Sequence, residues 1–416
     1  MDAEEASTIG ARARKIRRRR GLSLDVVAGL AGIGGPSYLS MLERGQRGFN
    51  RRGLIEDLAE ALGCSITDLT GQPYTAQDRS TADALAVLPA VSVALHECSL
   101  TDAPDVSTRP IEQLAALVAA ANRHVDETRY HLAGRNLDAV LTELHVHAIS
   151  GVPDVRRAAL AALAEACIVA AGIARPLGNG ELSTFAAKRA TEAAALIGSP
   201  ALASLAGMTR VGALVRLGAR HRAGGVLAGA LAAAAPHADP SAVDTAPAEG
   251  YGMLHLTGAQ LAAREGRAAD ADTHLTEARQ LAEITGERNA YRYHFGPANV
   301  AAWSLSIAVE LQRGPSAAEV LDASPALLVA LDSADRRAGT HLDLSRGYAQ
   351  AEGDRDNEAI RHLDSADRIA PTRIRNDPIA RDLVLTLDRR ARHRVWELDS
   401  LRTRFGVGPA SRNVKI

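Results

Sequence analysis

Three short stretches near the N-terminus predict a small helical domain. Residues 22–32 read LSLDVVAGLAG, residues 37–47 read SYLSMLERGQR, and residues 58–69 read LAEALGCSITDL. Apolar residues recur three or four apart in each, which is the periodicity of an amphipathic helix. Before them, Ile9, Ala13 and Ile16 form another apolar stripe, and Gly21 and Gly45 stand where glycines commonly end helices. The first seventy residues therefore predict five short helices around a small core.

The third of these helices has two different faces. Tyr38, Leu39 and Leu42 share one face, which can pack on the preceding helices. The opposite face carries hydroxyls, a thioether and a guanidinium, groups that can reach base edges and phosphates in a DNA major groove. Arginines in the following loop and on the first helix are placed to contact phosphates. The predicted DNA-binding residues are Arg18, Ser37, Ser40, Met41, Arg44, Arg47, Arg51 and Arg52.

The distribution of charge supports the same reading. The whole chain is balanced, with 48 basic and 49 acidic residues, yet the segment 9–52 holds eleven Lys or Arg against two acids. A single arginine on a helix is commonly no more than a solvated surface residue. Eleven around one small helical unit indicate that this end of the chain binds a polyanion.

These N-terminal residues resemble the helix-turn-helix domain of the Xre/Cro/phage-repressor family. The resemblance implies a five-helix domain that binds a double-stranded operator as a homodimer and reads it with the third helix. Glu43-Arg44-Gly45 matches the family's helix-ending E-x-G. Two positions depart from the pattern: Leu24 stands where the family usually has Gln, and Gly34-Gly35-Pro36 lengthens the turn by one residue. Both departures affect the base contacts rather than the fold.

The rest of the chain predicts further helices. Apolar helical stretches alternate with breaks at Gly, Pro and Asp, without the period-two pattern of strands. We expect an all-α chain with a helix-turn-helix domain at 1–73, a linker at 74–110, a helical-repeat domain at 111–405 and a tail at 406–416. The linker should hold one helix, 78–96, bent at Pro89.

Parts of the repeat domain match the offsets of a tetratricopeptide repeat, in which small residues let two antiparallel helices cross closely. The matching residues are Gly347, Ala359, Leu363, Ala366 and Pro371, then Ala271, Leu275 and Ala278, and finally Gly212 with Pro236. They predict an α-solenoid of tetratricopeptide-like helix pairs, whose concave side is a binding surface.

The chain as a whole then resembles regulators that join a helix-turn-helix domain to tetratricopeptide repeats. It is most similar to an actinomycete group in which sequences like GQPY, TELH, YGMLHL and HFGPANV recur. The resemblance implies that the repeats sense a peptide or small molecule and thereby set DNA affinity. It does not identify the ligand.

One segment of the repeat domain is rich in aromatic residues. Five of the chain's thirteen aromatics fall between residues 251 and 303, together with polar side chains able to orient a ligand. The candidate effector-binding residues are Tyr251, His255, Tyr293, His294, Asn299 and Trp303. The alternative is that these rings fill the core where two repeats diverge.

The sequence also favours some functional classes over others. It contains no P-loop, no GxSxG, no HExxH and no Cys-x-x-Cys, so we expect no enzyme activity, cofactor or metal site. Three separated cysteines, no signal peptide and no apolar run of about 18–20 residues predict a cytoplasmic protein. A ligand-responsive transcriptional regulator fits best. The alternative is a DNA-tethered adaptor whose repeats bind another protein.

Overall fold

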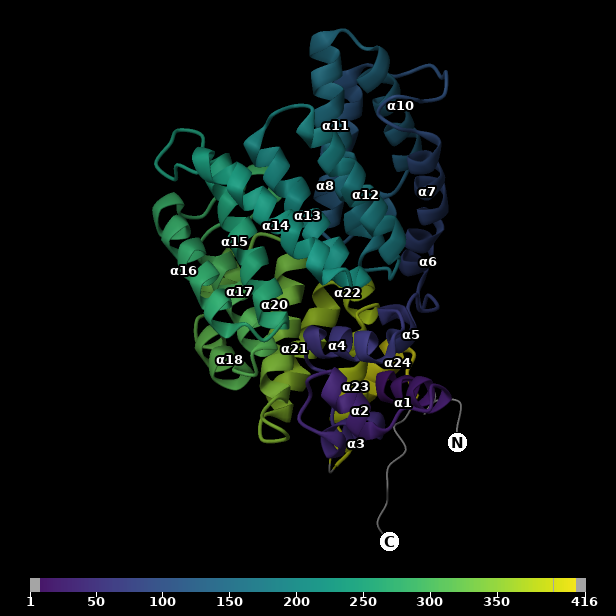
Figure 1. Cartoon of the computed structure of the whole chain (residues 1–416), viewed down its shortest axis with the longest axis vertical. Coiled ribbons are helices and arrows are strands. Elements are labelled where there is room, and N and C mark those ends of the chain that lie inside the picture. The colour runs from purple at the N-terminus through teal and green to yellow at the C-terminus, as the bar shows by residue number, and fades with distance from the viewer. Residues whose placement is uncertain (1–7, 392, 409–416) are drawn as a thin grey trace.

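The computed structural model describes residues 8–391 and 393–408, and over these residues the chain is all-helical (Figure 1). The five predicted N-terminal helices are present. They are α1 (Ile9–Arg19), α2 (Leu24–Leu30), α3 (Pro36–Glu43), α4 (Arg52–Leu62) and α5 (Ile66–Thr70). Because α3 begins at Pro36, the extra glycine of the turn lies outside the helix.

Local sequence signals set the limits of these helices. The side chains of Thr8 and Ser23 accept hydrogen bonds from the first turns of α1 and α2, so each acts as an N-cap. Leu39 and Leu42 are fully buried, as predicted. A Cβ at Gly10 would lie 2.1 Å from the carbonyl oxygen of Leu42, so the backbones of α1 and α3 meet at a point where only glycine fits.

The remaining helices form a long curved array. Its first part comprises α6 (Arg79–Ala86), α7 (Leu88–Glu97), α8 (Ile111–Asp126), α9 (Tyr130–Ala133), α10 (Leu137–Ser150), α11 (Pro153–Ala174), α12 (Gly180–Ala195), α13 (Pro200–Leu217), α14 (Arg220–Ala234) and the 3-10 helix η2 (Ala235–His237). Its second part comprises α15 (Ala246–Arg264), α16 (Ala268–Thr285), the 3-10 helix η3 (Ala290–Arg292), α17 (Pro297–Glu310), α18 (Gly314–Asp322), α19 (Pro325–Ala330), α20 (Ala334–Ala349), α21 (Asp356–Ile369), α22 (Pro371–Arg375), α23 (Pro378–Arg390) and α24 (Trp396–Phe405).

In place of the single bent helix expected over 78–96, the structure has two helices, α6 and α7, which meet at Val87 just before Pro89, and Asp78 is the N-cap of α6. Both helices contribute buried residues to the same apolar cluster as α10 and α11. The first part of the segment predicted as a linker is therefore packed into the array.

Successive helices of the array pack side by side, as predicted for a solenoid of helix pairs. Ala359, Leu363 and Ala366 are completely buried on α21, which packs on α20. A Cβ at Gly347 would lie 3.0 Å from the carbonyl oxygen of Gly314, so α20 passes close to the start of α18. Gly347, Ala359 and Ala366 thus lie where helices approach each other, whereas Gly212, which also matched the repeat pattern, has no neighbouring atom within 4 Å of a Cβ position.

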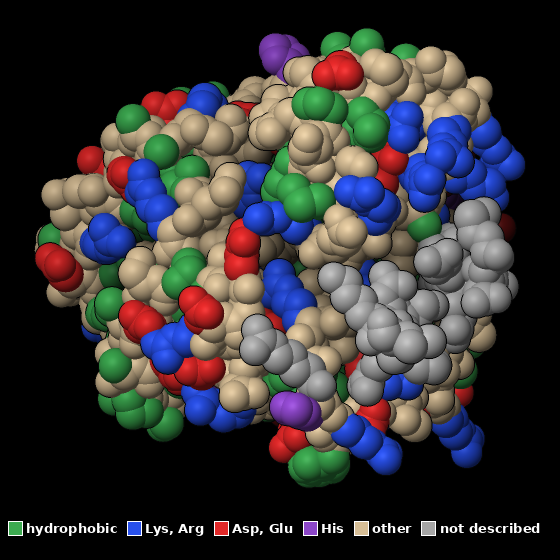
Figure 2. All heavy atoms as spheres, turned by 90° about the horizontal axis from the view of Figure 1, so that it is seen from below, with side chains coloured by type: hydrophobic (Ala, Val, Ile, Leu, Met, Phe, Trp, Pro, Cys, Tyr) green, Lys and Arg blue, Asp and Glu red, His purple; other side chains and the backbone are tan. Residues whose placement is uncertain are grey.

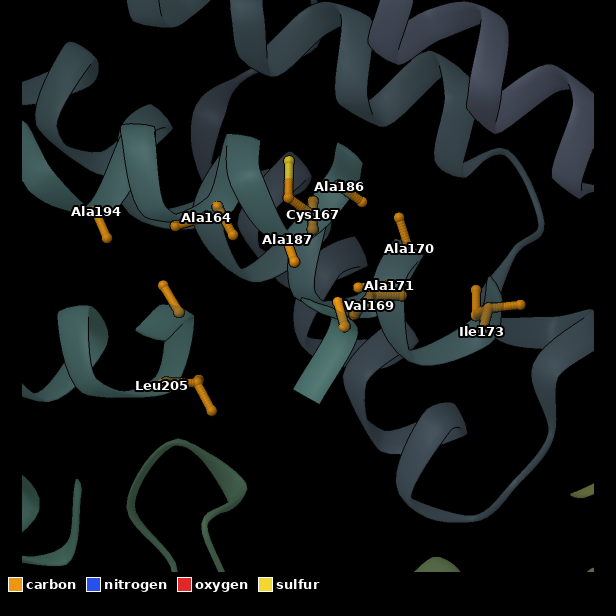
Figure 3. Close-up of a cluster of buried hydrophobic side chains, with 14 of the residues drawn as sticks. Ala164, Cys167, Val169, Ala170, Ala171, Ile173, Ala186, Ala187, Ala194 and Leu205 are labelled. Atoms are coloured by element: carbon orange, nitrogen blue, oxygen red, sulfur yellow. The ribbon is translucent and has the colours of Figure 1, made fainter. Parts of the chain in front are cut away.

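Alanine dominates the contacts between α11 and α12. Figure 3 shows Ala164 and Ala187 among the small side chains that meet there, with Cys167 beside them. By length and composition α11 could cross a membrane, which corrects the expectation that no such apolar run exists. Two thirds of its most apolar window is buried inside the protein, as in the core helix of a soluble fold.

The N-terminal helices pack against the last helices that the structure describes. In Figure 1 the purple helices α1–α4 lie beside the yellow helices α23 and α24. One apolar cluster joins them, with residues such as Leu54 and Leu58 on α4, and Leu383 and Leu387 on α23. The N-terminal domain therefore shares a core with the C-terminal helices.

Candidate DNA interface and adjoining cavity

The predicted reading face of α3 lies on the molecular surface. Ser37 and Arg44 are exposed, and Ser40 and Met41 are half-buried. A Cβ at Gly35 would have no neighbouring atom within 4 Å, so the approach to the start of α3 is open. The structure thus brings the four predicted base-reading residues together on one accessible helix.

A buried ion pair orients α3 against α1. Arg17 Nε lies 2.6 Å from Glu43 Oε1, and Arg17 Nη2 lies 2.8 Å from Glu43 Oε2. This bidentate geometry explains the acidic residue of the E-x-G pattern. The next residues of α1, Arg18 and Arg19, remain exposed.

The view of this end of the molecule in Figure 2 shows Lys and Arg side chains gathered on the right, the side on which α1 lies in Figure 1. Arg18, one of the predicted phosphate contacts, is exposed on α1, which packs against α3.

The loop after α3 faces the array, which corrects part of the predicted phosphate contacts. Arg52 Nη2 lies 2.7 Å from Asp377 Oδ2, and although burial alone would lower the pKa of Arg52, the Asp377 carboxylate raises it. Arg47 Nη2 donates to Glu352 Oε2 at 2.9 Å, and its guanidinium lies over the Tyr38 ring. Arg51 is half-buried. In this arrangement Arg52 is part of the contact between the domain and the array rather than of a DNA surface.

Carboxylates of the array also hold the backbone of this loop and of α4. Glu310 accepts from the backbone nitrogens of Arg52 at 3.0 Å and Gly53 at 3.1 Å, so it caps the N-terminus of α4. Asp382 accepts from the Phe49 nitrogen at 2.7 Å. Arg346, almost wholly buried, pairs with Glu310 and donates to the Asn50 carbonyl at 2.9 Å.

A third link lies further along α4. Glu56 is buried and accepts from Arg264 Nη1 at 2.9 Å and from Arg220 Nε at 3.2 Å. These arginines come from α15 and α14, so the helix-turn-helix domain is held by several helices of the array at once.

A cavity of about 310 Å³ opens beside this junction. Its walls come from α8, α11, α12, α13, α15, η3, α17, α20 and α22, and Arg52 of α4 also contributes. A smaller cavity of about 120 Å³ adjoins it and is walled partly by α4 and α5. The DNA-binding domain itself therefore forms part of the wall of the cavity system.

Three of the six predicted effector-binding residues line the larger cavity: His294, Asn299 and Trp303. His294 Nε2 lies 2.9 Å from Asp126 Oδ2, and Asn299 Nδ2 donates to the Tyr293 carbonyl at 3.3 Å. The aromatic segment thus does reach a cavity, through η3 and α17.

The other three predicted residues are placed differently. Tyr293 is completely buried, with its hydroxyl donating to the Ala201 carbonyl, so for this ring the core interpretation is correct. Tyr251 packs edge-on against His255, whose Nδ1 lies 3.0 Å from His274 Nδ1 on α16. Neither Tyr251 nor His255 is among the residues that line the cavity.

The chemical character of this cavity was not among the expectations from sequence. Seven arginines line it, against three aspartates. The arginines are Arg52, Arg175, Arg216, Arg264, Arg292, Arg336 and Arg373. These arginines are spread over more than three hundred residues of sequence, so no local motif indicates that they line one cavity.

Comparison with known proteins identifies the N-terminal part. Residues 8–70 match the family model of a helix-turn-helix domain, the class of module that places a recognition helix in DNA. No curated protein matches the chain. A solved structure, the crystal structure of Bacillus thuringiensis PlcR in complex with the peptide PapR7 and DNA, is 14% identical, with 67% of this chain and 95% of that chain covered. Its TM-score of 0.28 is too low to establish a shared arrangement of helices.

Proposed function

We propose that this protein is a sequence-specific transcriptional regulator that binds double-stranded DNA through α3 and the basic face of α1. Its array binds a small molecule or peptide in the cavity, and that effector sets the affinity for DNA. The protein acts in the cytoplasm and does so by binding, without a catalytic step.

One observation carries the link between effector and DNA. Arg52 and Arg264 line the cavity and at the same time hold α4, through the start of that helix and through Glu56. A ligand that repositions either guanidinium changes how the DNA-binding domain is held. A ligand shifts such an equilibrium only by its differential affinity for the two arrangements, and contacts with these arginines supply that difference.

The size of the cavity favours an effector over the adaptor alternative. Its volume of about 310 Å³ falls within the range of small-ligand sites. Its walls are concave and include Trp303 and Tyr291, whereas a docking surface for a folded protein would be broad and open.

The DNA surface is tested with Ser40→Ala and Arg44→Ala in the full-length protein. Genomic fragments selected by the wild-type protein serve as the DNA in gel-shift titrations. We expect Arg44→Ala to cost about 1–3 kcal/mol of binding free energy, Ser40→Ala less, and neither to change the melting temperature.

Arg157→Ala is the matched control, because Arg157 is an exposed arginine on α11. It should bind DNA like the wild type. If both α3 variants also bind like the wild type, α3 is not the reading helix.

A further inference from the structure

Three arginines of the cavity have no acidic partner. Among the described residues, none of the ion pairs involves Arg175, Arg216 or Arg336, all of which line the cavity. The other cavity arginines are paired, for example Arg373 with Asp335. Unpaired guanidinium groups in a recess are unusual, because a charge that loses water needs a counter-charge to offset the cost.

The carboxylates of the cavity cannot supply that counter-charge, because each is already engaged. Asp126 binds His294, Arg292 and Ser333. Asp335 pairs with Arg373, and Asp343 pairs with Arg346. Asp335 is the carboxylate that acts on Arg175, Arg216 and Arg336 together, and it is already bound to Arg373, so positive charge predominates in this part of the cavity.

This positive charge is concentrated where the two cavities meet. Arg175 and Arg216 line both the larger and the smaller cavity. Arg175 follows the last turn of α11, and Arg216 lies near the end of α13. The ends of these two helices therefore place both arginines where the cavities meet. Arg336 comes from the start of α20 and lines the larger cavity.

The electrostatics agree with this placement. Burial lowers the pKa of Arg216, and repulsion from Arg175 and Arg52 lowers it further. Burial also lowers the pKa of Arg336; the Asp335 carboxylate opposes this effect, and Arg175 adds to it. Arg175 is thus an electrostatic neighbour of both other unpaired arginines.

Apolar side chains also line the cavity. They include Met208 and Val211 on α13, Ile168 on α11 and Trp303 on α17. The guanidinium of Arg336 lies 5.6 Å from the centre of the Trp303 ring, so the charged and apolar parts of the site adjoin. A ligand that fills this space has an anionic group at one end and an apolar body at the other.

We propose that the cavity binds an amphiphilic anion, a carboxylate or phosphate with an apolar tail, whose charged group is held by Arg175, Arg216 and Arg336. Guanidinium groups suit either oxyanion, since both accept paired N–H donors. The anion site is inferred from the geometry of the cavity alone. Only the effect of the anion on DNA binding rests on the proposed function.

Binding is tested by calorimetry on the full-length protein with three probes that share a six-carbon alkyl tail: hexyl phosphate, heptanoate and hexanol. We expect at least one anion to bind at least tenfold more tightly than hexanol. Which of the two anions binds better identifies the oxyanion. Equal affinity for all three probes would show that the arginines do not hold a charge.

Trp303 provides an independent signal. The only other tryptophan, Trp396, is exposed, so Trp396→Phe leaves Trp303 as the sole reporter. The emission of that variant should change on addition of the anion that binds in calorimetry. An unchanged emission would place the anion outside this cavity.

Arg216→Gln tests the role of the cluster, with Arg157→Gln on α11 as the matched control. Arg216→Gln should weaken anion binding at least tenfold, and Arg157→Gln should leave it unchanged. Without anion, Arg216→Gln should raise the melting temperature, because it relieves repulsion between like charges. A lower melting temperature, or unchanged anion binding, would mean that Arg216 has a structural role, and the proposal would fail.

Gel shifts separate this proposal from the proposed function. If the anion binds but leaves DNA affinity unchanged, the anion site is confirmed and the proposal that it is an effector site is wrong. If the α3 variants bind DNA normally, the proposed DNA surface is wrong, while calorimetry still decides the anion site.

Discussion

His145 is completely buried, and its hydrogen bonds define its protonation state. Arg189 Nη1 lies 2.6 Å from His145 Nε2, and because a guanidinium can only donate, Nε2 accepts. Nδ1 then donates to the Leu141 carbonyl at 2.7 Å. Burial lowers the pKa of His145 to about 4; the bond to Leu141 opposes the shift, and the charge of Arg189 adds to it. The folded protein therefore holds this histidine neutral.

The lowered pKa makes His145 a source of acid sensitivity. The unfolded chain takes up a proton near pH 6.5 and the folded chain only near pH 4, so the stabilisation is complete above about pH 6.5 and is lost as the pH falls toward 4. Between pH 7 and 5 this residue should cost about 2 kcal/mol of unfolding free energy. Urea titrations at both pH values give the free energy of unfolding. Between pH 7 and 5 this free energy should fall by about 2 kcal/mol less in His145→Gln than in the wild type. An equal loss in both proteins would mean that His145 does not titrate as argued.

Single residues also show how far the sequence could be read. The burial of Leu39 and Leu42 followed from helical spacing, because the period of a helix is a local property. The placement of Tyr251 and Tyr293 could not be predicted in the same way, because clustering in sequence does not indicate which side of a helix faces a cavity. One ring lies beside α16 and the other in the core, while Trp303, thirteen residues from the start of η3, does reach the cavity.

The loop between α3 and α4 is the element whose role was hardest to predict from the sequence. Its contacts reach across the chain: Phe49 and Asp382 are 333 residues apart, and Arg52 and Glu310 are 258 apart. No local sequence pattern predicts contacts between residues that far apart in the chain. A basic loop after a recognition helix is typical of phosphate contacts, so the sequence favoured DNA for arginines that in fact bind the array.

Glu310→Ala tests how α4 is held. The change leaves two backbone N–H groups of α4 uncapped and the guanidinium of Arg346 without its buried partner, although Asp343 remains beside it. Breaking a buried pair in this way should cost about 3–5 kcal/mol. It should also loosen the loop, so that trypsin cleaves faster after Arg47, Arg51 or Arg52.

Glu319→Ala is the control, because its ion pair with Arg355 is exposed and contributes at most about 1 kcal/mol. It should melt and digest like the wild type. If Glu310→Ala did the same, the contact between α4 and α17 would not hold the domain in solution.

On the scale of the whole molecule, the docking of the helix-turn-helix domain has a consequence for DNA. A single small domain contacts few base pairs, so we propose that a dimer binds two half-sites about one helical turn, roughly 34 Å, apart. Because each domain shares a core with its own array, the separation of the two recognition helices is a property of the whole dimer. A domain on a flexible tether would have no such constraint.

The spacing of the half-sites therefore tests both the dimer and the docking. Inserting five base pairs between the half-sites turns one of them to the opposite side of the duplex, whereas ten restore its phase. We expect the five-pair insertion to weaken binding by at least about tenfold, because a docked domain cannot follow the rotation. The ten-pair insertion should weaken it less, since only the distance has changed. Footprinting should show two protected segments on the uninterrupted site. A single protected half-site would mean that a monomer binds, and equal affinity for all three spacings would mean that the domain leaves the array on DNA.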